Sequence, residues 1–399
     1  MSREKIISVL LVTFTYIIAT GVSYTLFSGK AFTENTADST SQPQSGSEDG
    51  LTFDDTLPKT EACPLNGEKY SKKQKEWWEQ HRPLGAMIEN HSEARPQSGL
   101  ATADVVYEAV AEGGITRFLA IFYCRDGGSI GPVRSARTYF LDWISEYGDY
   151  PLYTHVGGAN CDPATGSGCL NGAKADALGQ IQEYGWASYN DLSQFNLSYP
   201  TFKRVERPNG RDVASEHTMF SSTEELWKVA QMRELTNVNK DGDSWDKDFV
   251  KYVFKDDGQE AEGLQAQVIH LEPWEDYKEY AVDWIYDKAS NVYKRKNGGK
   301  PHVDKNTNKQ ITAKNIVVLI MIESHANDGY EDNVHLLYRT KGTGKAYIFM
   351  DGREIIGTWG KDGRSARTLL FDSNGSPIEF NRGTIWFEIL PSFGVINVS

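Results

Sequence analysis

The stretch Thr116 to Cys124 reads Thr-Arg-Phe-Leu-Ala-Ile-Phe-Tyr-Cys, and it decides the fold class. It is continuous, apolar and aromatic, and Arg117 is its one charged residue. An apolar run of this length, bounded by turn residues, predicts a strand that is buried within a sheet. Gly113 and Gly114 stand just before it and predict a turn from the preceding segment. We therefore expect a β-sheet core in this part of the chain.

The segments around this strand predict a mixture of strands and helices. The clearest helix opens after Ser222, because Ser222 and Glu225 have the spacing of a capping box. The segment Asp104 to Val110 fits either a strand or a short helix. The capped helix opens at 221–225 and runs to about residue 235. The other expected elements are strands at 84–88 and 152–156 and a helix at 137–147.

After Asp248 the pattern changes to short apolar runs separated by turn signals such as Asn297-Gly298-Gly299 and Asn374-Gly375. Met350-Asp351-Gly352-Arg353 is the clearest hairpin signal among them. The expected strands are 249–254, 266–271, 279–286, 316–322, 334–338, 346–350, 355–359, 367–371 and 384–389. The sequence thus predicts an α+β chain, with a mixed α+β N-terminal domain followed by a mostly β C-terminal domain.

Composition limits the classes of partner. The chain has 399 residues, a formal net charge of −13 and 39% hydrophobic residues. It is long enough for two ordinary domains. An acidic chain repels phosphate backbones, so we expect no nucleic-acid partner.

The N-terminus predicts a membrane anchor. Residues 6–27 are almost wholly apolar and follow Arg3 and Lys5, while acidic residues come after them. By the positive-inside rule the N-terminus stays in the cytoplasm and the rest is exported. A signal peptide cut after Ser23 is the alternative. No cysteine precedes Cys63, so we expect a helical anchor rather than a lipid.

The expected organisation has five parts. Residues 29–60 are polar and poor in large apolar residues, which is typical of a disordered tether. The expected parts are 1–28 (cytoplasmic stub and transmembrane signal anchor), 29–60 (disordered linker), 61–235 (N-terminal domain), 236–262 (interdomain connection) and 263–399 (strand-rich C-terminal domain).

Four cysteines are compatible with an oxidising compartment, where disulfides form. Four cysteines allow three pairings. We expect Cys161–Cys169, which closes a short glycine-containing loop, and Cys63–Cys124. A zinc site of His155, Cys161 and Cys169 is the alternative, although this spacing matches no tight zinc-finger pattern. We expect no metal and no cofactor.

The first polar stretch follows directly on the strand expected at 84–88 and contains Asn90, His91 and Arg95. Polar residues at a strand exit often form sites, because a rigid element aims a loop. The alternative is a loop whose Asn and Ser side chains form turn and cap hydrogen bonds.

The second stretch contains Glu108, Glu112 and Arg117. The two glutamates are four residues apart, so on a helix they would share a face. Paired carboxylates can divide acid and base roles. They can equally form structural ion pairs with arginines.

The third stretch holds Arg134 and Arg137 near a predicted helix start, where two guanidiniums would bind a carboxylate or phosphate. They would pair equally well with Glu108 and Glu112 inside the protein. His155 and His217 are further candidates, although a lone histidine is usually structural. The sequence contains no Gly-x-Ser-x-Gly elbow, Walker loop or His-Glu-x-x-His motif.

These stretches together resemble the YerB-like lipoprotein family, which carries the domain of unknown function 3048 in N-terminal and C-terminal parts. The resemblance extends over about residues 78–393. Its motifs are Arg82–His91, Ala94–Leu100, Ala103–Glu108, Ala111–Phe118, Gly131–Arg137, Gly344–Gly352, Gly357–Trp359 and Gly383–Glu388. The resemblance implies an exported two-domain protein tethered to the cytoplasmic membrane, and it implies no particular reaction. The chain departs from the family in its membrane span and in the Cys161–Cys169 loop.

We therefore expect a single-pass protein of the cytoplasmic membrane whose domains are extracytoplasmic and bind an anionic envelope ligand, such as a cell-wall polymer, or a protein partner. The expected ligand-binding residues are Asn90, His91, Arg95, Glu108, Glu112, Arg117, Arg134, Arg137, His155 and His217. One alternative is an envelope hydrolase with His91 or His155 as base and Glu112 as acid. The other is a structural scaffold whose charged motifs are core ion pairs.

Overall fold

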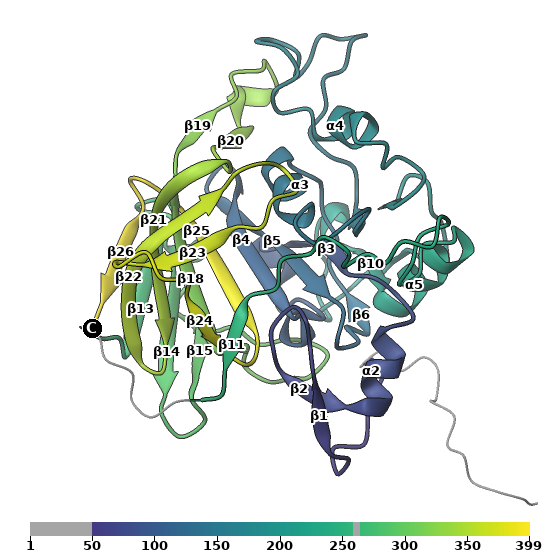
Figure 1. Ribbon diagram of the computed structural model, residues 1–399. Helices are drawn as coiled ribbons and strands as arrows, with labels where there is room; N and C mark the ends of the chain where they lie inside the picture. The colour runs from purple at the N-terminus through teal and green to yellow at the C-terminus, as the bar shows by residue number, and fades with distance from the viewer. Residues whose placement is uncertain (1–49, 258–263) are drawn as a thin grey trace, which may run out of the picture. The chain divides into compact units, whose positions relative to one another are not determined.

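The computed structural model describes residues 50–257 and 264–399 (Figure 1). The predicted anchor at 6–27 lies outside the described residues, as does most of the predicted linker. Among the helices of the described ranges, none has the length and apolar character that crossing a bilayer requires. Leu51 N donates to Asp126 Oδ2 at 2.8 Å, and Phe53 packs against Trp77, so residues 51–53 already lie against the folded body.

One long mixed sheet organises the chain, and the stretch that decides the fold lies near its middle as β5 (Ile115–Phe122). The strand order is β12-β22-β21-β18-β25-β4-β5-β3-β7-β8, with β23 paired to β22. Strands from both halves of the sequence share this sheet, because β4 of the first half pairs in parallel with β25 of the second (Figure 1). The remaining bounds are β3 (Leu84–Glu89), β4 (Val105–Glu112), β7 (Leu152–His155), β8 (Asp191–Ser193), β12 (Leu264–Gln265), β18 (Asn315–Met321), β21 (Gly342–Met350), β22 (Arg353–Lys361), β23 (Leu369–Asp372) and β25 (Ile385–Pro391).

Both faces of the long sheet are covered, which explains its continuous apolar strands. On one face, Trp284 of a second sheet packs against Trp386 with ring centroids 5.3 Å apart. On the other, Trp143 of α3 (Thr138–Ile144) stacks on Tyr107 with centroids 5.5 Å apart. The second sheet is formed by β13 (Val268–Glu272), β14 (Val282–Asp287), β15 (Val292–Asn297), β16 (Lys300–Pro301), β17 (Thr312–Ala313) and β26 (Val395–Val398).

The described residues contain four α-helices, all before residue 233, so the chain is mostly β with some helix. Ser222 Oγ accepts from Glu225 N at 3.2 Å, which confirms the predicted cap of α5 (Thr223–Met232). The other helices are α2 (Lys72–Trp78) and α4 (Ala177–Glu183). Short strands complete the fold: β1 (Lys59–Ala62), β2 (Lys69–Ser71), β6 (Ser129–Ile130), β9 (Lys203–Arg204), β10 (Met219–Ser222), β11 (Val253–Lys255), β19 (Glu323–His325), β20 (Leu336–Tyr338) and β24 (Glu379–Asn381).

The predicted hairpin at Met350–Arg353 is confirmed. Asp351 and Gly352 have φ values of 56° and 69° between the paired strands β21 and β22. Two positive φ angles define a type I′ turn, and its twist matches that of the flanking strands.

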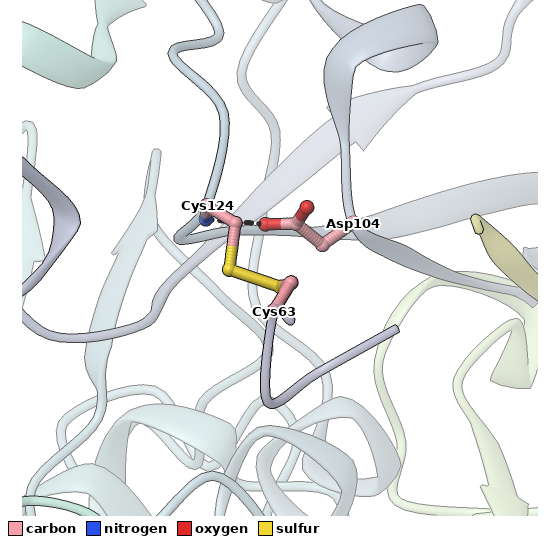
Figure 2. A group of neighbouring side chains, drawn as sticks. All are labelled: Cys63, Asp104 and Cys124. Atoms are coloured by element: carbon pink, nitrogen blue, oxygen red, sulfur yellow. Dashed lines mark hydrogen bonds between the residues drawn. A yellow bond between two sulfur atoms is a disulfide. The ribbon is translucent and has the colours of Figure 1, made fainter. Parts of the chain in front are cut away.

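Both predicted disulfides are present. Cys161 and Cys169 close the short loop before α4, and Cys63 is joined to Cys124 at the end of β5. Figure 2 shows the second bond beside Asp104, whose Oδ2 accepts from Cys124 N at 2.8 Å. The zinc alternative is wrong, because both of its cysteines are in a disulfide and His155 bonds Asp191 instead.

Two local predictions need correction. Glu108 and Glu112 do not share a helix face, because their segment is strand β4 with a register shift between Val110 and Glu112. The segment forms a strand because Val105, Val106 and Tyr107 are β-branched or aromatic residues, which favour strands, and because it pairs with β5. The strand predicted at 249–254 is shorter and begins only at Val253.

Candidate functional site

The direction of the strands brings charged residues to one edge of the long sheet. Strands β18, β25, β4, β3, β7 and β8 all run in the same direction. Glu89 ends β3, Glu112 ends β4 and His155 ends β7, while Arg117 stands near the start of the antiparallel β5. The carboxyl ends of parallel strands are a common place for ligand sites, because loops of several strands converge there.

Glu112 joins two arginines at this edge. Its Oε1 accepts from Arg117 Nη2 at 2.9 Å, and its Oε2 pairs with Arg137 Nη2. Burial alone would raise the pKa of Glu112, but Arg117 and Arg137 outweigh burial and hold that pKa far below its usual range. The other terminal nitrogens of the two arginines donate to Ser135 O and Ala136 O, so both heads are fixed from inside.

Glu89 is the second carboxylate of the edge. Its Oε2 pairs with Arg134 Nε and lies 3.3 Å from His217 Nδ1. Burial would raise the pKa of Glu89, but the hydrogen bond with His217 and the charges of Arg117 and Arg134 lower it below its usual value. Arg117 and Arg134 also act on Glu112, so both carboxylates share one electrostatic environment. We call Glu89, Glu112, Arg117, Arg134, Arg137 and His217 the edge cluster.

Arg134 differs from the other arginines of the edge cluster. Its side chain is 22% exposed, whereas that of Arg117 is 1% exposed. Within the described residues, Nη1 and Nη2 of Arg134 form no hydrogen bond and are not among the buried nitrogens, whereas the buried Nε pairs with Glu89. The two terminal nitrogens therefore reach solvent. A third carboxylate, Glu93, lies 3.7 Å from His217 Nε2 beside the cluster. Among the guanidiniums of the edge cluster, Arg134 is therefore distinguished by its two terminal nitrogens, which have no partner among the described residues.

His91 and His217 lie beside Arg134's partner Glu89. Their rings are parallel, with an interplanar angle of 4° and centroids 4.6 Å apart. Together with Glu93 they place three possible metal-ligand atoms within 4.8 Å of one another. Lone pairs in parallel rings do not converge on one point, and His91 Nδ1 already accepts from Glu93 N at 3.3 Å. A metal would need one ring to rotate, so this trio fits a metal poorly.

His155 is fully engaged inside the protein. Its Nε2 lies 2.8 Å from Asp191 Oδ1, and its Nδ1 lies 2.6 Å from Gly157 O. The ring is buried. Because both nitrogens have partners, His155 has no free nitrogen to act as a base on an external substrate.

The remaining predicted residues lie in a different environment, between the two sheets. Asn90 Nδ2 donates to Glu108 Oε1 at 3.2 Å, and Glu108 Oε2 pairs with Arg295 from β15. Arg95 Nε donates to Asn90 O at 3.1 Å and is half-buried at the border of this group. Asn90 and Glu108 are buried, so an external ligand does not reach them without local opening.

Sequence reasoning missed the C-terminal members of this group. Arg295 is buried between the rings of Trp386, Trp284 and Phe118, and its Nη1 lies 2.5 Å from His302 Nδ1. Glu388 accepts from Trp284 Nε1 at 2.8 Å. Burial and the charge of Glu108 raise the pKa of Glu388 well above its usual value. We call Asn90, Glu108, Arg295, His302 and Glu388 the buried network.

The ten predicted residues thus separate into two groups. Glu112, Arg117, Arg134, Arg137 and His217 belong to the edge cluster, and His91 stacks on it, while His155 ends the neighbouring strand. Asn90 and Glu108 belong to the buried network, with Arg95 at its border. Ligand binding by any of them stays a prediction.

Comparisons with known proteins identify the family. Residues 66–236 match "Protein of unknown function (DUF3048) N-terminal domain", and residues 273–387 match the "DUF3048 C-terminal domain". The chain carries both parts and therefore belongs to the DUF3048 family, as the sequence motifs predicted.

One relative and one solved structure agree with this assignment. The chain is 29% identical over 360 residues to "Putative lipoprotein YerB" of Bacillus subtilis (strain 168), which covers 86% of this chain and 90% of the relative. It is similar in fold to the crystal structure of the YerB protein from Bacillus subtilis, with a TM-score of 0.65 and 24% identity. That match covers 85% of this chain and 100% of the solved one.

Proposed function

We propose that the protein is tethered at the outer face of the cytoplasmic membrane, where it binds an anionic group of the cell envelope at Arg134. The tether is the apolar segment 6–27, which has no charged residue and follows Arg3 and Lys5. Two disulfides support an oxidising location outside the cytoplasm. The description of the Bacillus subtilis relative as a lipoprotein supports an envelope location too.

The observation that carries the ligand proposal is the free end of Arg134. Glu89 holds its Nε, so the guanidinium is oriented, while Nη1 and Nη2 form no hydrogen bond among the described residues. A planar guanidinium with two free donors binds a carboxylate or phosphate in a bidentate manner. Because Glu89 is itself held by His217, the arginine loses little side-chain freedom on binding.

We favour a repeating anionic polymer of the wall over a single small anion. The protein is acidic overall, with a net charge of −13, so one partly exposed arginine attracts a free anion weakly. A polymer presents many charges and can contact additional residues along the edge. A protein partner that presents an acidic side chain is the second candidate.

Hydrolysis at this edge has less support. The lowered pKa of Glu112 opposes a role as general acid at neutral pH, because the carboxyl would already be ionised. His155 has both ring nitrogens engaged. His91 keeps Nε2 without a hydrogen bond among the described residues, but no serine, cysteine or threonine hydroxyl or thiol contacts its ring there.

The test measures binding of the full chain in detergent micelles to poly(glycerol phosphate) and to neutral peptidoglycan fragments. We expect saturable binding of the polymer, and a loss of affinity of at least tenfold in Arg134→Ala. Arg339→Ala is the matched control, because it removes an exposed arginine whose side chain forms no hydrogen bond or ion pair within the described residues.

Two results would contradict the proposal. Equal polymer binding by wild type and Arg134→Ala would place the polymer elsewhere on the surface. An absence of binding to either polymer or fragments, with folding confirmed by fluorescence, would leave the acidic-protein partner as the better hypothesis. Arg134→Lys should recover part of the affinity, because it restores the charge without the fork.

A further inference from the structure

A second basic site lies at the opposite edge of the long sheet, in a cavity of about 170 Å³. Arg125 follows β5, Lys314 precedes β18 and Thr384 precedes β25. These strand ends point away from the edge cluster, because β5 runs antiparallel to its neighbours and β18 and β25 begin where β4 begins. The cavity is lined by residues of both family domains, so it lies at the junction between them.

Three cations line the cavity, and each of them also has a carboxylate partner outside the lining. Arg125, Lys314 and Arg382 line the cavity, and Glu68 is the one acid among the lining residues. Arg382 Nε donates to Asp256 Oδ1 at 2.7 Å, and Lys314 Nζ pairs with Asp257. Those two aspartates are 73% and 44% exposed, so water screens them and they neutralise the cations only partly.

Arg125 is the most constrained of the three cations. Its Nη2 donates to Thr384 Oγ1 at 2.8 Å and to Ala103 O, and its Nε lies 3.6 Å from Asp104 Oδ1. Asp104 is in turn fixed beside the Cys63–Cys124 disulfide (Figure 2). The remaining nitrogen, Nη1, forms no hydrogen bond within the parts of the chain that the structure describes, and the side chain is 22% exposed. The head is therefore oriented before any ligand arrives.

Gly383 holds the lysine at the cavity. A Cβ at this position would approach Lys314 Cγ to 2.6 Å, so the lysine stem packs directly on the glycine backbone. Gly383 also has a φ of +134°, and its N donates to Asn66 O at 2.9 Å. A residue with a side chain would displace both the turn and the lysine. Local backbone geometry thus fixes the lysine stem at the cavity that Arg125 and Arg382 also line.

We propose that this cavity binds a small phosphate-class anion, and that the bound anion links the two domains. The unbonded Nη1 of Arg125 and the lysine point charge are groups that recognise phosphate oxygens. Arg382 adds positive charge, because its Nη1 and Nη2 already donate to Gly67 O and Phe254 O. The cavity is smaller than the 300–1,000 Å³ typical of drug-sized ligands, which favours inorganic phosphate or a short phosphate monoester. The site is independent of Arg134, since the two lie at opposite edges of the sheet.

The test is isothermal titration of the full chain in detergent with inorganic phosphate, with glycerol 3-phosphate and with chloride at matched ionic strength. We expect saturable binding of at least one phosphate compound and none of chloride. Comparing the affinities for inorganic phosphate and glycerol 3-phosphate distinguishes a free phosphate from the phosphoester of a larger molecule. Lys314→Gln should weaken binding at least tenfold, whereas Lys300→Gln, an exposed lysine outside the cavity, should leave it unchanged.

Thermal unfolding provides the second measurement. Phosphate should raise the unfolding midpoint of wild type and of Arg134→Ala equally, because a ligand of the native state stabilises it. The rise should be absent in Lys314→Gln and in Arg382→Gln. No saturable binding up to tens of millimolar phosphate, or equal binding by Lys314→Gln and wild type, would overturn the proposal. If Arg134→Ala still binds phosphate, the cavity does not depend on the edge cluster. The two proposals can then fail independently of each other.

Discussion

The edge cluster and the buried network contain the same kinds of residue, yet they behave as different parts of the molecule. Each has carboxylates, at least one guanidinium and a histidine within hydrogen-bonding distance. Arg295 is 0% exposed and surrounded by three aromatic rings, whereas Arg134 is 22% exposed with two donors in solvent. Burial, and not residue type, therefore decides whether a charged motif is structural or available to a ligand.

Removal of the central cation of the buried network should have the largest effect. Arg295→Met leaves the Glu108 carboxylate buried without its charge partner, although Thr116 and Asn90 still donate hydrogen bonds to it. We expect a loss of about 3–5 kcal/mol in the free energy of unfolding. Urea unfolding of the full chain in detergent, followed by tryptophan fluorescence, measures it. A loss below about 1 kcal/mol would mean that water reaches this network, which would contradict the distinction between the buried network and the edge cluster.

The second largest effect should be on the pH dependence of the free energy of unfolding, through the buried network. The pKa of Glu388 is raised in the folded state, so its contribution to stability is fully present below its ordinary pKa and is lost as pH rises. Between about pH 5 and 8 wild type should therefore lose stability relative to Glu388→Gln, by up to about 1.4 kcal/mol per pH unit. The variant should be at least as stable as wild type at pH 7.

Asp104, whose pKa burial raises to about 6, acts in the same direction, but it is present in both proteins. The difference between the two urea-unfolding profiles thus isolates Glu388. Parallel profiles from pH 4 to 8 would show that burial and the charge of Glu108 do not raise the pKa of Glu388 in the folded protein.

The smallest effect on stability should come from the edge. Arg134→Ala removes a partner of Glu89, but His217 stays at 3.3 Å and water can enter the vacated space. We expect a loss of about 1 kcal/mol or less, because partly exposed ion pairs contribute little. Chemical denaturation of Arg134→Ala, with Arg339→Ala as the control, measures this loss in the free energy of unfolding. A loss as large as that of Arg295→Met would show that Arg134 is structural and would remove the basis of the ligand proposal.

The sequence predicted the elements of the fold better than their assembly. The apolar run 116–124, the capping box at Ser222 and the Asp351-Gly352 turn are local signals, and each appears as predicted. The pairing of β4 with β25 joins residues about 280 positions apart, and no local pattern encodes such a contact. The sharing of one sheet by strands of both halves therefore emerges only from the structure.

The candidate site shows the same limit. The residues of the three polar stretches do come near one another, because they stand at strand ends and in adjoining loops. The separation of Glu108 from Glu112 could not be predicted, since it depends on a register shift within β4 and on Arg295, which comes from a distant strand. The alternation in Val292–Asn297, which places Arg295 on the same strand face as Tyr293, was the one signal available.

The position of β25 has a consequence for the order of events during synthesis. The strand ends at Pro391, close to the end of the chain, yet it fills the place between β4 and β18 in the middle of the long sheet. Until it is made, β4 and β18 each present an unpaired apolar edge, which is the kind of surface that aggregates or recruits a chaperone. A chain stopped before residue 385 would therefore lose the partner strand of both halves at once, so the integrity of the whole sheet depends on synthesis having passed β25.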